Sequence, residues 1–62
     1  MKITDIKRSM RVWYKNYYYK GDDSYLELYN ALKTMRSAGL ISDDTWGKIY
    51  DYDRELFQEF NG

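Results

Sequence analysis

Hydrophobic positions recur along the chain at helical spacing in three segments. Two clusters of turn-forming residues, at positions 21–24 and 39–42, separate these segments, and the chain has no proline. When side chains are placed at about 100° per residue around each segment, the apolar ones gather on one side. The pattern predicts an all-α fold in which residues 1–62 form a single domain, a compact three-helix bundle. The expected helices cover about residues 4–20, 24–38 and 43–60.

The first expected helix carries an apolar arc that faces the core. Thr4 or Asp5 is expected to cap its start, because both residue types accept hydrogen bonds from the first unpaired backbone N–H groups. Gly21 is expected to close the helix in the left-handed conformation. The apolar arc consists of Ile3, Ile6, Met10, Trp13 and Tyr17, with Tyr14 beside it.

The second expected helix begins and ends with recognisable signals. Ser24 is followed three residues later by Glu27, the spacing of a capping box in which each side chain accepts from the other residue's backbone N–H. Gly39 with Leu40 behind it predicts a Schellman closure, in which Leu40 folds back onto the last turn. The apolar face consists of Tyr25, Leu28, Ala31, Leu32 and Met35.

The third expected helix starts at Ser42, which is expected to be its N-cap, with Asp43 and Asp44 in the first turn. Gly47 follows closely, where glycine costs up to about 1 kcal/mol relative to alanine. It either permits the close approach of a neighbour or is simply tolerated. The apolar face consists of Trp46, Ile49, Tyr50, Leu56, Phe57 and Phe60.

Asp53 interrupts this third apolar face, since the helical projection places it between Ile49 and Phe57. A buried carboxylate without a partner costs several kcal/mol. We therefore expect Asp53 to be a buried structural residue that accepts hydrogen bonds from a tyrosine hydroxyl, a tryptophan indole or an arginine of the first two helices. The alternative is that Asp53 pairs with a basic group of a partner across an interface.

Composition narrows the range of functions. Cysteine and histidine are absent, so disulfides and thiolate metal sites are excluded, as is the side chain best suited to proton transfer near neutral pH. Carboxylates one or two positions apart, such as Asp51 and Asp53, point to different sides of a helix. We therefore expect no catalytic residues, no metal and no cofactor. No apolar run approaches the roughly 20 residues of a membrane helix, so we expect a cytoplasmic protein without membrane contact.

Charge is distributed unevenly although the net charge is zero. The first 20 residues hold six basic side chains and one acidic one, whereas the last 21 hold two basic and six acidic ones. The basic groups of the first helix alternate with aromatic ones on the side opposite its apolar arc, at spacings of three, four and seven that bring them onto one face. We call this set the outer face; it consists of Arg8, Arg11, Val12, Lys15, Tyr18 and Tyr19.

The outer face has three interpretations. Tyrosine and arginine are enriched at protein interfaces, so the favoured hypothesis is a small, non-enzymatic module that binds a protein partner through the first helix. The alternative is a nucleic-acid-binding accessory protein whose basic groups neutralise phosphates and whose tyrosines stack on bases. The third interpretation is a solvated surface whose long basic side chains cover apolar groups. Homo-oligomerisation through the oppositely charged helices is a further possibility.

Two resemblances bear on these hypotheses. The passage 32–60, with Ala-Gly-Leu-Ile-Ser at its turn, resembles the helical hairpins of many small bacterial and phage modules, including short self-associating C-terminal domains. The composition, rich in Lys, Tyr and Asp and without proline, is similar to that of small phage accessory proteins, many of which bind and inhibit a host protein. The resemblance implies a phage-type inhibitor or adaptor that docks on a host protein.

Overall fold

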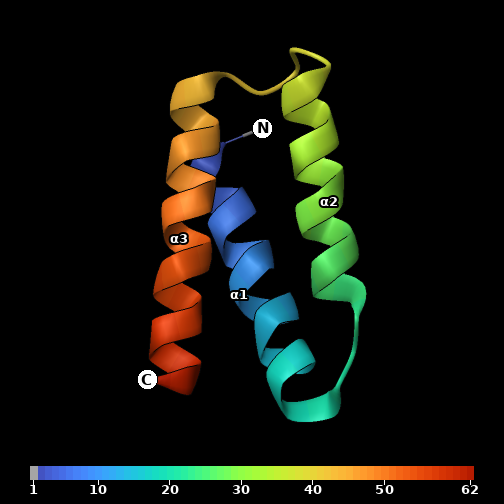
Figure 1. Cartoon of the computed structure of the whole chain (residues 1–62), viewed down its shortest axis with the longest axis vertical. Helices are drawn as coiled ribbons and strands as arrows, with labels where there is room; N and C mark the ends of the chain where they lie inside the picture. Colours follow the sequence, from blue (N-terminus) through green and yellow to red (C-terminus); the bar gives the residue numbers. More distant parts are fainter. Residues whose placement is uncertain (1) are drawn as a thin grey trace.

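The computed structural model describes residues 2–62, which form three packed α-helices without strands. The all-α prediction is confirmed, and each predicted helix end lies within one residue of the observed one. The chain runs down α1, up α2 and down α3, so that α1 and α3 point in the same direction (Figure 1). The helices are α1 (Ile3–Lys20), α2 (Ser24–Ser37) and α3 (Asp43–Asn61).

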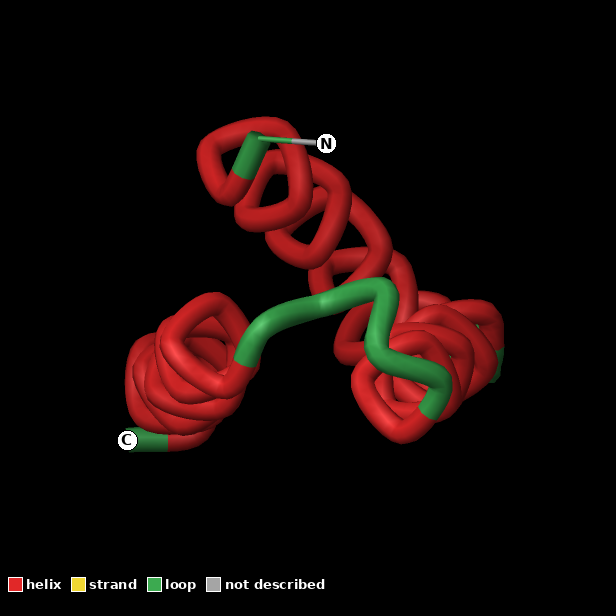
Figure 2. The backbone as a smooth tube through the Cα atoms, turned by 90° about the horizontal axis from the view of Figure 1, so that it is seen from above, coloured by secondary structure: helices red, strands yellow, loops and turns green. Residues whose placement is uncertain are grey.

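The first helix holds the bundle together. α1 packs against both other helices, whereas α2 and α3 contact each other least. Seen from above, α2 and α3 lie apart, and the loop between them crosses the space between their ends (Figure 2). α1 begins away from both helices and slants toward α2 (Figure 2). The buried residues come from all three helices and this loop: Ile6, Met10, Tyr14, Tyr25, Leu32, Ile41, Ile49 and Leu56.

The core lies to one side of the predicted apolar arcs. On α1 the buried residues are Ile6, Met10 and Tyr14, and Trp13, expected in the core, is 40% exposed. The reason is that α2 and α3 both pack against α1, from two sides. The side of α1 that they cover together includes Tyr14 and leaves Trp13 at its margin. Tyr17 lies at the edge of this arc and is exposed.

On α3 the predicted apolar face is wider than the buried one. Tyr50 and Phe57, both expected in the core, are 49% and 61% exposed. Only Ile49 and Leu56 are fully covered, because α2 packs loosely against α3 and leaves the side that carries Tyr50 and Phe57 in contact with solvent. Ala31 of α2 is likewise exposed rather than packed.

The predicted caps of α1 are wrong at its start and confirmed at its end. The N-cap residue is Lys2, with no side-chain cap, because the backbone N–H of Asp5 already bonds to the Lys2 carbonyl at 3.1 Å. Thr4 and Asp5 therefore lie inside the first turn. At the other end Gly21 adopts the left-handed conformation with φ +69°, and its N–H bonds to the Tyr17 carbonyl at 3.1 Å.

The start of α2 differs from the predicted capping box. Ser24 is the first helical residue, and both its backbone N–H and its hydroxyl donate to Oδ1 of Asp22, at 2.9 and 2.7 Å. These hydrogen bonds to Ser24 lower the pKa of the Asp22 carboxyl. The Ser24 N–H, which the capping box would pair with Glu27, therefore bonds to the Asp22 carboxylate, a side-chain acceptor two residues earlier. The N–H of Glu27 bonds to the Asp23 carbonyl at 3.3 Å and not to the Ser24 hydroxyl.

The turn between α2 and α3 has the predicted Schellman geometry. Gly39 has φ +79°, the N–H of Leu40 bonds to the Met35 carbonyl at 2.9 Å, and the N–H of Gly39 bonds to the Arg36 carbonyl at 3.0 Å. Leu40 itself, expected to fold onto the last turn, is 72% exposed. Ile41, the next residue, is buried instead.

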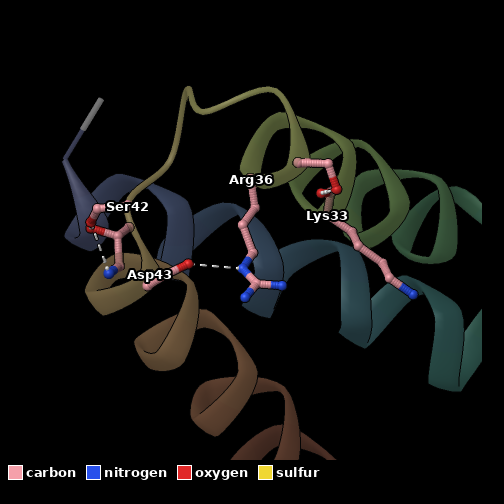
Figure 3. Close-up of polar contacts among 6 residues, drawn as sticks. Lys33, Arg36, Ser42 and Asp43 are labelled. Atoms are coloured by element: carbon pink, nitrogen blue, oxygen red, sulfur yellow. Dashed lines mark hydrogen bonds and ion pairs between the residues drawn. The ribbon is translucent and has the colours of Figure 1, made fainter.

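The first turn of α3 is fixed on two sides. The Ser42 hydroxyl accepts the backbone N–H of Thr45 at 3.2 Å, so the predicted N-cap is confirmed. The guanidinium of Arg36, near the end of α2, reaches the Asp43 carboxylate at 3.2 Å and ties the two helices together at this end of the bundle (Figure 3). The Ser37 hydroxyl donates to the Lys33 carbonyl one turn earlier.

Candidate interaction surfaces

All six side chains of the outer face are exposed on α1. Three of them carry exposed apolar or aromatic surface: Val12 is 53% exposed, Tyr18 45% and Tyr19 65%. Contiguous exposed apolar groups on a small protein commonly mark a contact surface. The six differ in what they contact: some line a hollow on α1, some contact the end of α3, Tyr19 does both, and Arg8 pairs with a carboxylate of α1.

The first group lines a hollow to which only α1 contributes side chains. Val12, Lys15 and Tyr19 line a shallow hollow of about 520 Å³, together with two other residues of the same helix. The two lysines that line this hollow, Lys15 and Lys20, make no ion pair within residues 2–62. The hollow therefore combines an aliphatic and an aromatic side chain with two lysines; its other two lining residues are Asn16 and Lys20.

The second group, Arg11, Tyr18 and Tyr19, contacts the end of α3. Arg11 forms a two-point contact with Glu59, with nitrogen to oxygen distances of 2.7 and 3.1 Å, and this contact raises the pKa of the guanidinium. The Tyr18 ring stacks on Phe60 with centroids 5.6 Å apart, and the Tyr19 ring meets Phe60 edge-on at 6.1 Å. Phe60 therefore extends the outer face onto α3.

Arg8 lies at the opposite end of the outer face from this aromatic group. It pairs with Asp5 one turn earlier on the same helix, at 3.7 Å. Two of the three basic side chains of the outer face thus already have a carboxylate neighbour. The remaining one, Lys15, lines the hollow described above.

Asp53 is half-buried, and not fully buried as predicted, because the loosely packed side of α3 leaves it partly in contact with solvent. Its Oδ1 accepts a hydrogen bond of 2.5 Å from the hydroxyl of Tyr25, one of the three kinds of donor expected from the sequence. Burial raises the pKa of the Tyr25 phenol well above its ordinary value, and the hydrogen bond to Asp53 and the charge of this carboxylate raise it further. Tyr25 therefore stays protonated and remains a donor.

A hollow of about 370 Å³ opens beside Asp53 on the surface where α1 meets α3. Tyr14 contributes to it from α1, and its hydroxyl accepts a hydrogen bond of 3.1 Å from the Asn61 side chain. Burial raises the pKa of Tyr14, and the Asp53 charge raises it as well. We call this cavity the Asp53 hollow; its lining residues are Tyr14, Asp53, Arg54, Phe57 and Gln58.

Phe57 and Phe60 differ in burial although the sequence predicts both in the core. Phe57 is 61% exposed, whereas Phe60 is partly buried against the core and also contacts the rings of Tyr18 and Tyr19 on the outer face. Their spacing of three residues gives no signal that distinguishes a core ring from a surface ring. Only the position of α1 relative to α3 does so.

Comparison of the chain with protein-family models, with curated proteins and with solved structures gives no match. Across residues 2–62, no group of three or more carboxylates lies close enough together to hold a metal ion. In the same part of the chain, no helix has the length and apolarity needed to cross a membrane. The outer face and the Asp53 hollow are thus the features from which a function can be argued.

Proposed function

We propose that the chain is a small, non-enzymatic protein-binding module that docks on its partner through the outer face of α1. The observation that carries this proposal is the exposure of Val12, Tyr18 and Tyr19 side by side on one helix, by 45% to 65%. Tyrosine supplies large contact areas at little entropic cost and is enriched at interface hot spots. Such an arrangement suits a protein partner with an apolar recess.

The aromatic part of the outer face is held in place before any partner arrives. Tyr18 and Tyr19 contact each other at right angles with centroids 5.1 Å apart, and both contact Phe60. The Arg11 guanidinium lies 6.0 Å from the Phe60 ring centre while it pairs with Glu59. Because these side chains are already ordered by contacts within the chain, less conformational entropy is lost when they bind.

The mode of action that we propose is that of an inhibitor or adaptor. A domain of 62 residues with one dominant binding surface acts by covering a site on its partner or by bringing the partner to a second molecule. The compositional similarity to phage accessory proteins supports an inhibitor of a host protein. Self-association through α1 and the acidic α3 of a second copy is a variant of the same proposal.

Nucleic-acid binding is the second candidate, and the hollow on α1 is what favours it. Lys15, Lys20 and Tyr19 meet there, so phosphate neutralisation and base stacking would be available at one place. It ranks second because Arg8 and Arg11 already face carboxylates. Both would have to exchange these partners for phosphates.

The test is affinity capture from a lysate of the source organism or its host, with and without nuclease and at two salt concentrations. The informative variant is Lys15→Glu with Tyr19→Ala, which changes the hollow on α1 and leaves the Arg11 and Tyr18 contacts with α3 intact. The matched control is Lys33→Glu with Tyr50→Ala, which makes the same changes at exposed positions of α2 and α3. Circular dichroism checks that both variants stay helical.

The wild type and the control are expected to retain the same protein at stoichiometric amounts after nuclease and high salt, and the Lys15/Tyr19 variant to lose it. Equal retention by that variant would remove the outer face from consideration. Recovery that requires nucleic acid and low salt would favour the second candidate. A mass above that of the monomer at micromolar concentration, without any other ligand, would indicate self-association as the function.

A further inference from the structure

The Asp53 hollow brings a carboxylate and aromatic rings together at one opening. Tyr14 enters from α1, and Asp53 and Phe57 enter from α3, around a space of about 370 Å³. Phe57 is 61% exposed and half-buried Asp53 lies one helical turn away from it. The opening thus offers a negative charge at one side and the face or edge of a ring at another.

The negative charge of Asp53 is not balanced by a cation of the chain. No basic side chain among residues 2–62 lies within ion-pair distance of it, and its one donor is the neutral hydroxyl of Tyr25. An ionised carboxylate has room for about four hydrogen bonds. The charge of Asp53 also acts on neighbouring phenols, because it is one of the causes that raise the pKa values of Tyr14, Tyr25 and Tyr29.

Arg54 lines the same hollow but does not neutralise Asp53. Successive residues of a helix point in directions about 100° apart, so the two side chains leave α3 in different directions although both border the hollow. The Arg54 guanidinium is also at the rim of a second, more polar hollow with Asp51, Glu55 and Gln58. Its positive charge raises the cost of bringing another cation to Asp53.

We infer that the Asp53 hollow binds the guanidinium of an arginine side chain supplied by a partner protein. A guanidinium pairs with a carboxylate through two parallel hydrogen bonds and stacks on aromatic rings, and Asp53 with the exposed ring of Phe57 offers both kinds of contact. This site is formed by α3 together with Tyr14 of α1, and none of the six outer-face residues lines it. It neither requires nor excludes the docking mode proposed above.

The experiment uses the whole chain and a small probe, N-acetyl-arginine amide, with N-acetyl-citrulline amide as the uncharged probe of the same shape. Backbone amide shifts of residues 53–58 are followed by NMR during titration. The key variant is Asp53→Asn, which removes the charge but keeps an oxygen that accepts from Tyr25. Asp51→Asn, an exposed carboxylate two residues earlier on α3 that does not line the Asp53 hollow, is the matched control.

We expect saturable shifts with the arginine probe, with a dissociation constant on the order of millimolar, and none with the citrulline probe. Asp53→Asn should weaken binding about tenfold, and Asp51→Asn should leave it unchanged. Phe57→Ala, at an exposed position that does not threaten folding, should weaken binding about threefold. Arg54→Gln should strengthen it.

Three results would overturn the inference: equal binding of both probes, unchanged binding by Asp53→Asn, or no saturable shift at residues 53–58 in the folded wild type. If Asp53→Asn unfolds the chain, the Phe57→Ala and Arg54→Gln variants decide the matter. Opposite effects of these two support an arginine site, and no effect of either one contradicts it. None of these outcomes depends on whether a protein partner docks on the outer face of α1.

Discussion

The hydroxyl of Tyr25, in the first turns of α2, donates a hydrogen bond to the Asp53 carboxylate of α3. It joins the two helices that contact each other least. Of the described side-chain contacts between α2 and α3, this hydrogen bond and the Arg36–Asp43 ion pair are the polar ones, and they lie toward opposite ends of α2. The Tyr29 and Trp46 rings, 5.5 Å apart, contact each other between them.

Replacing Tyr25 by phenylalanine should test the strength of this link. The ring stays in the core while the donor is lost, so we expect the free energy of unfolding to fall by about 1.5 kcal/mol, as for a hydrogen bond to a charged group. Urea unfolding followed by circular dichroism measures it. Tyr19→Phe, whose hydroxyl makes no hydrogen bond among residues 2–62, serves as the control and should change the unfolding free energy little.

Stability should fall with rising pH above the ordinary pKa of tyrosine, 10.0. The pKa of the Tyr25 phenol is raised in the folded chain by burial, by its hydrogen bond to Asp53 and by that carboxylate's charge, and those of Tyr14 and Tyr29 are raised chiefly by burial. Above that pH the unfolded chain has lost phenolic protons that the folded chain still holds, so the unfolded state binds fewer protons and stability decreases as pH rises.

Urea unfolding at several pH values from neutral to strongly alkaline measures this dependence, and phenolate absorbance counts the tyrosines that titrate late. The stabilising contribution is complete below the ordinary pKa and is lost as pH passes through the raised values. Tyr25→Phe should make the decline shallower. A decline of the same steepness in this variant would show that Tyr25 does not contribute to it.

Truncation of the core should be severe. The Met10 side chain is 0% exposed at the centre of α1, and Met10→Ala is expected to lower the unfolding free energy by about 2–5 kcal/mol. A domain of this length has a total stability of about 3–9 kcal/mol, so much of the variant should be unfolded at room temperature. Circular dichroism measures the loss of helix. Leu26→Ala, at a position 45% exposed on α2, should leave the chain folded.

Glycine substitutions should have opposite effects at two positions with equal space around them. A Cβ atom at Gly39 or at Gly47 would meet nothing within 4 Å. Gly39 has φ +79°, so Gly39→Ala should destabilise the chain by about 1 kcal/mol through backbone strain. Gly47 lies within α3, where alanine is favoured, so Gly47→Ala should stabilise it by about 0.5–1 kcal/mol.

The Gly47 result also bears on why glycine stands there. The open space around it excludes the close approach of a neighbouring element as the reason, so within the bundle this glycine is tolerated. Thermal unfolding of both variants in parallel gives the comparison. A lower unfolding temperature for Gly47→Ala would mean that the residue serves something other than the packing of this chain.

The helices could be predicted because the signals for them are local. Periodicity places the three segments, and the glycines at positions 21 and 39 end two of them as expected. The caps were harder, since several acceptors stand within a few residues of one another. At the start of α2, Asp22 competes with Ser24 and Glu27, and the pattern of residue types alone does not show which acceptor wins.

The division between core and surface could be predicted only in part. A helical projection identifies the apolar side of α1 but not how α2 and α3 share it, so it predicts Trp13 inside and Tyr14 at the edge, whereas Tyr14 is buried and Trp13 is 40% exposed. The contacts that outer-face residues make with α3 could not be predicted from the sequence either. Arg11 and Glu59 stand 48 positions apart, and their contact depends on the register of α1 against α3, which no local pattern encodes.

The parallel course of α1 and α3 has an electrostatic consequence. Both helices end at the same pole of the bundle, where Tyr18 stacks on Phe60 and Asn61 reaches Tyr14 (Figure 1). The backbone dipoles of two helices therefore direct their negative ends to this pole, against the single positive end of α2. The last turn of α3 holds no basic residue to offset its share. Lys20 offsets the share of α1, so a cation that approaches the end of α3 is attracted by the peptide groups of that helix themselves, in addition to any side chain.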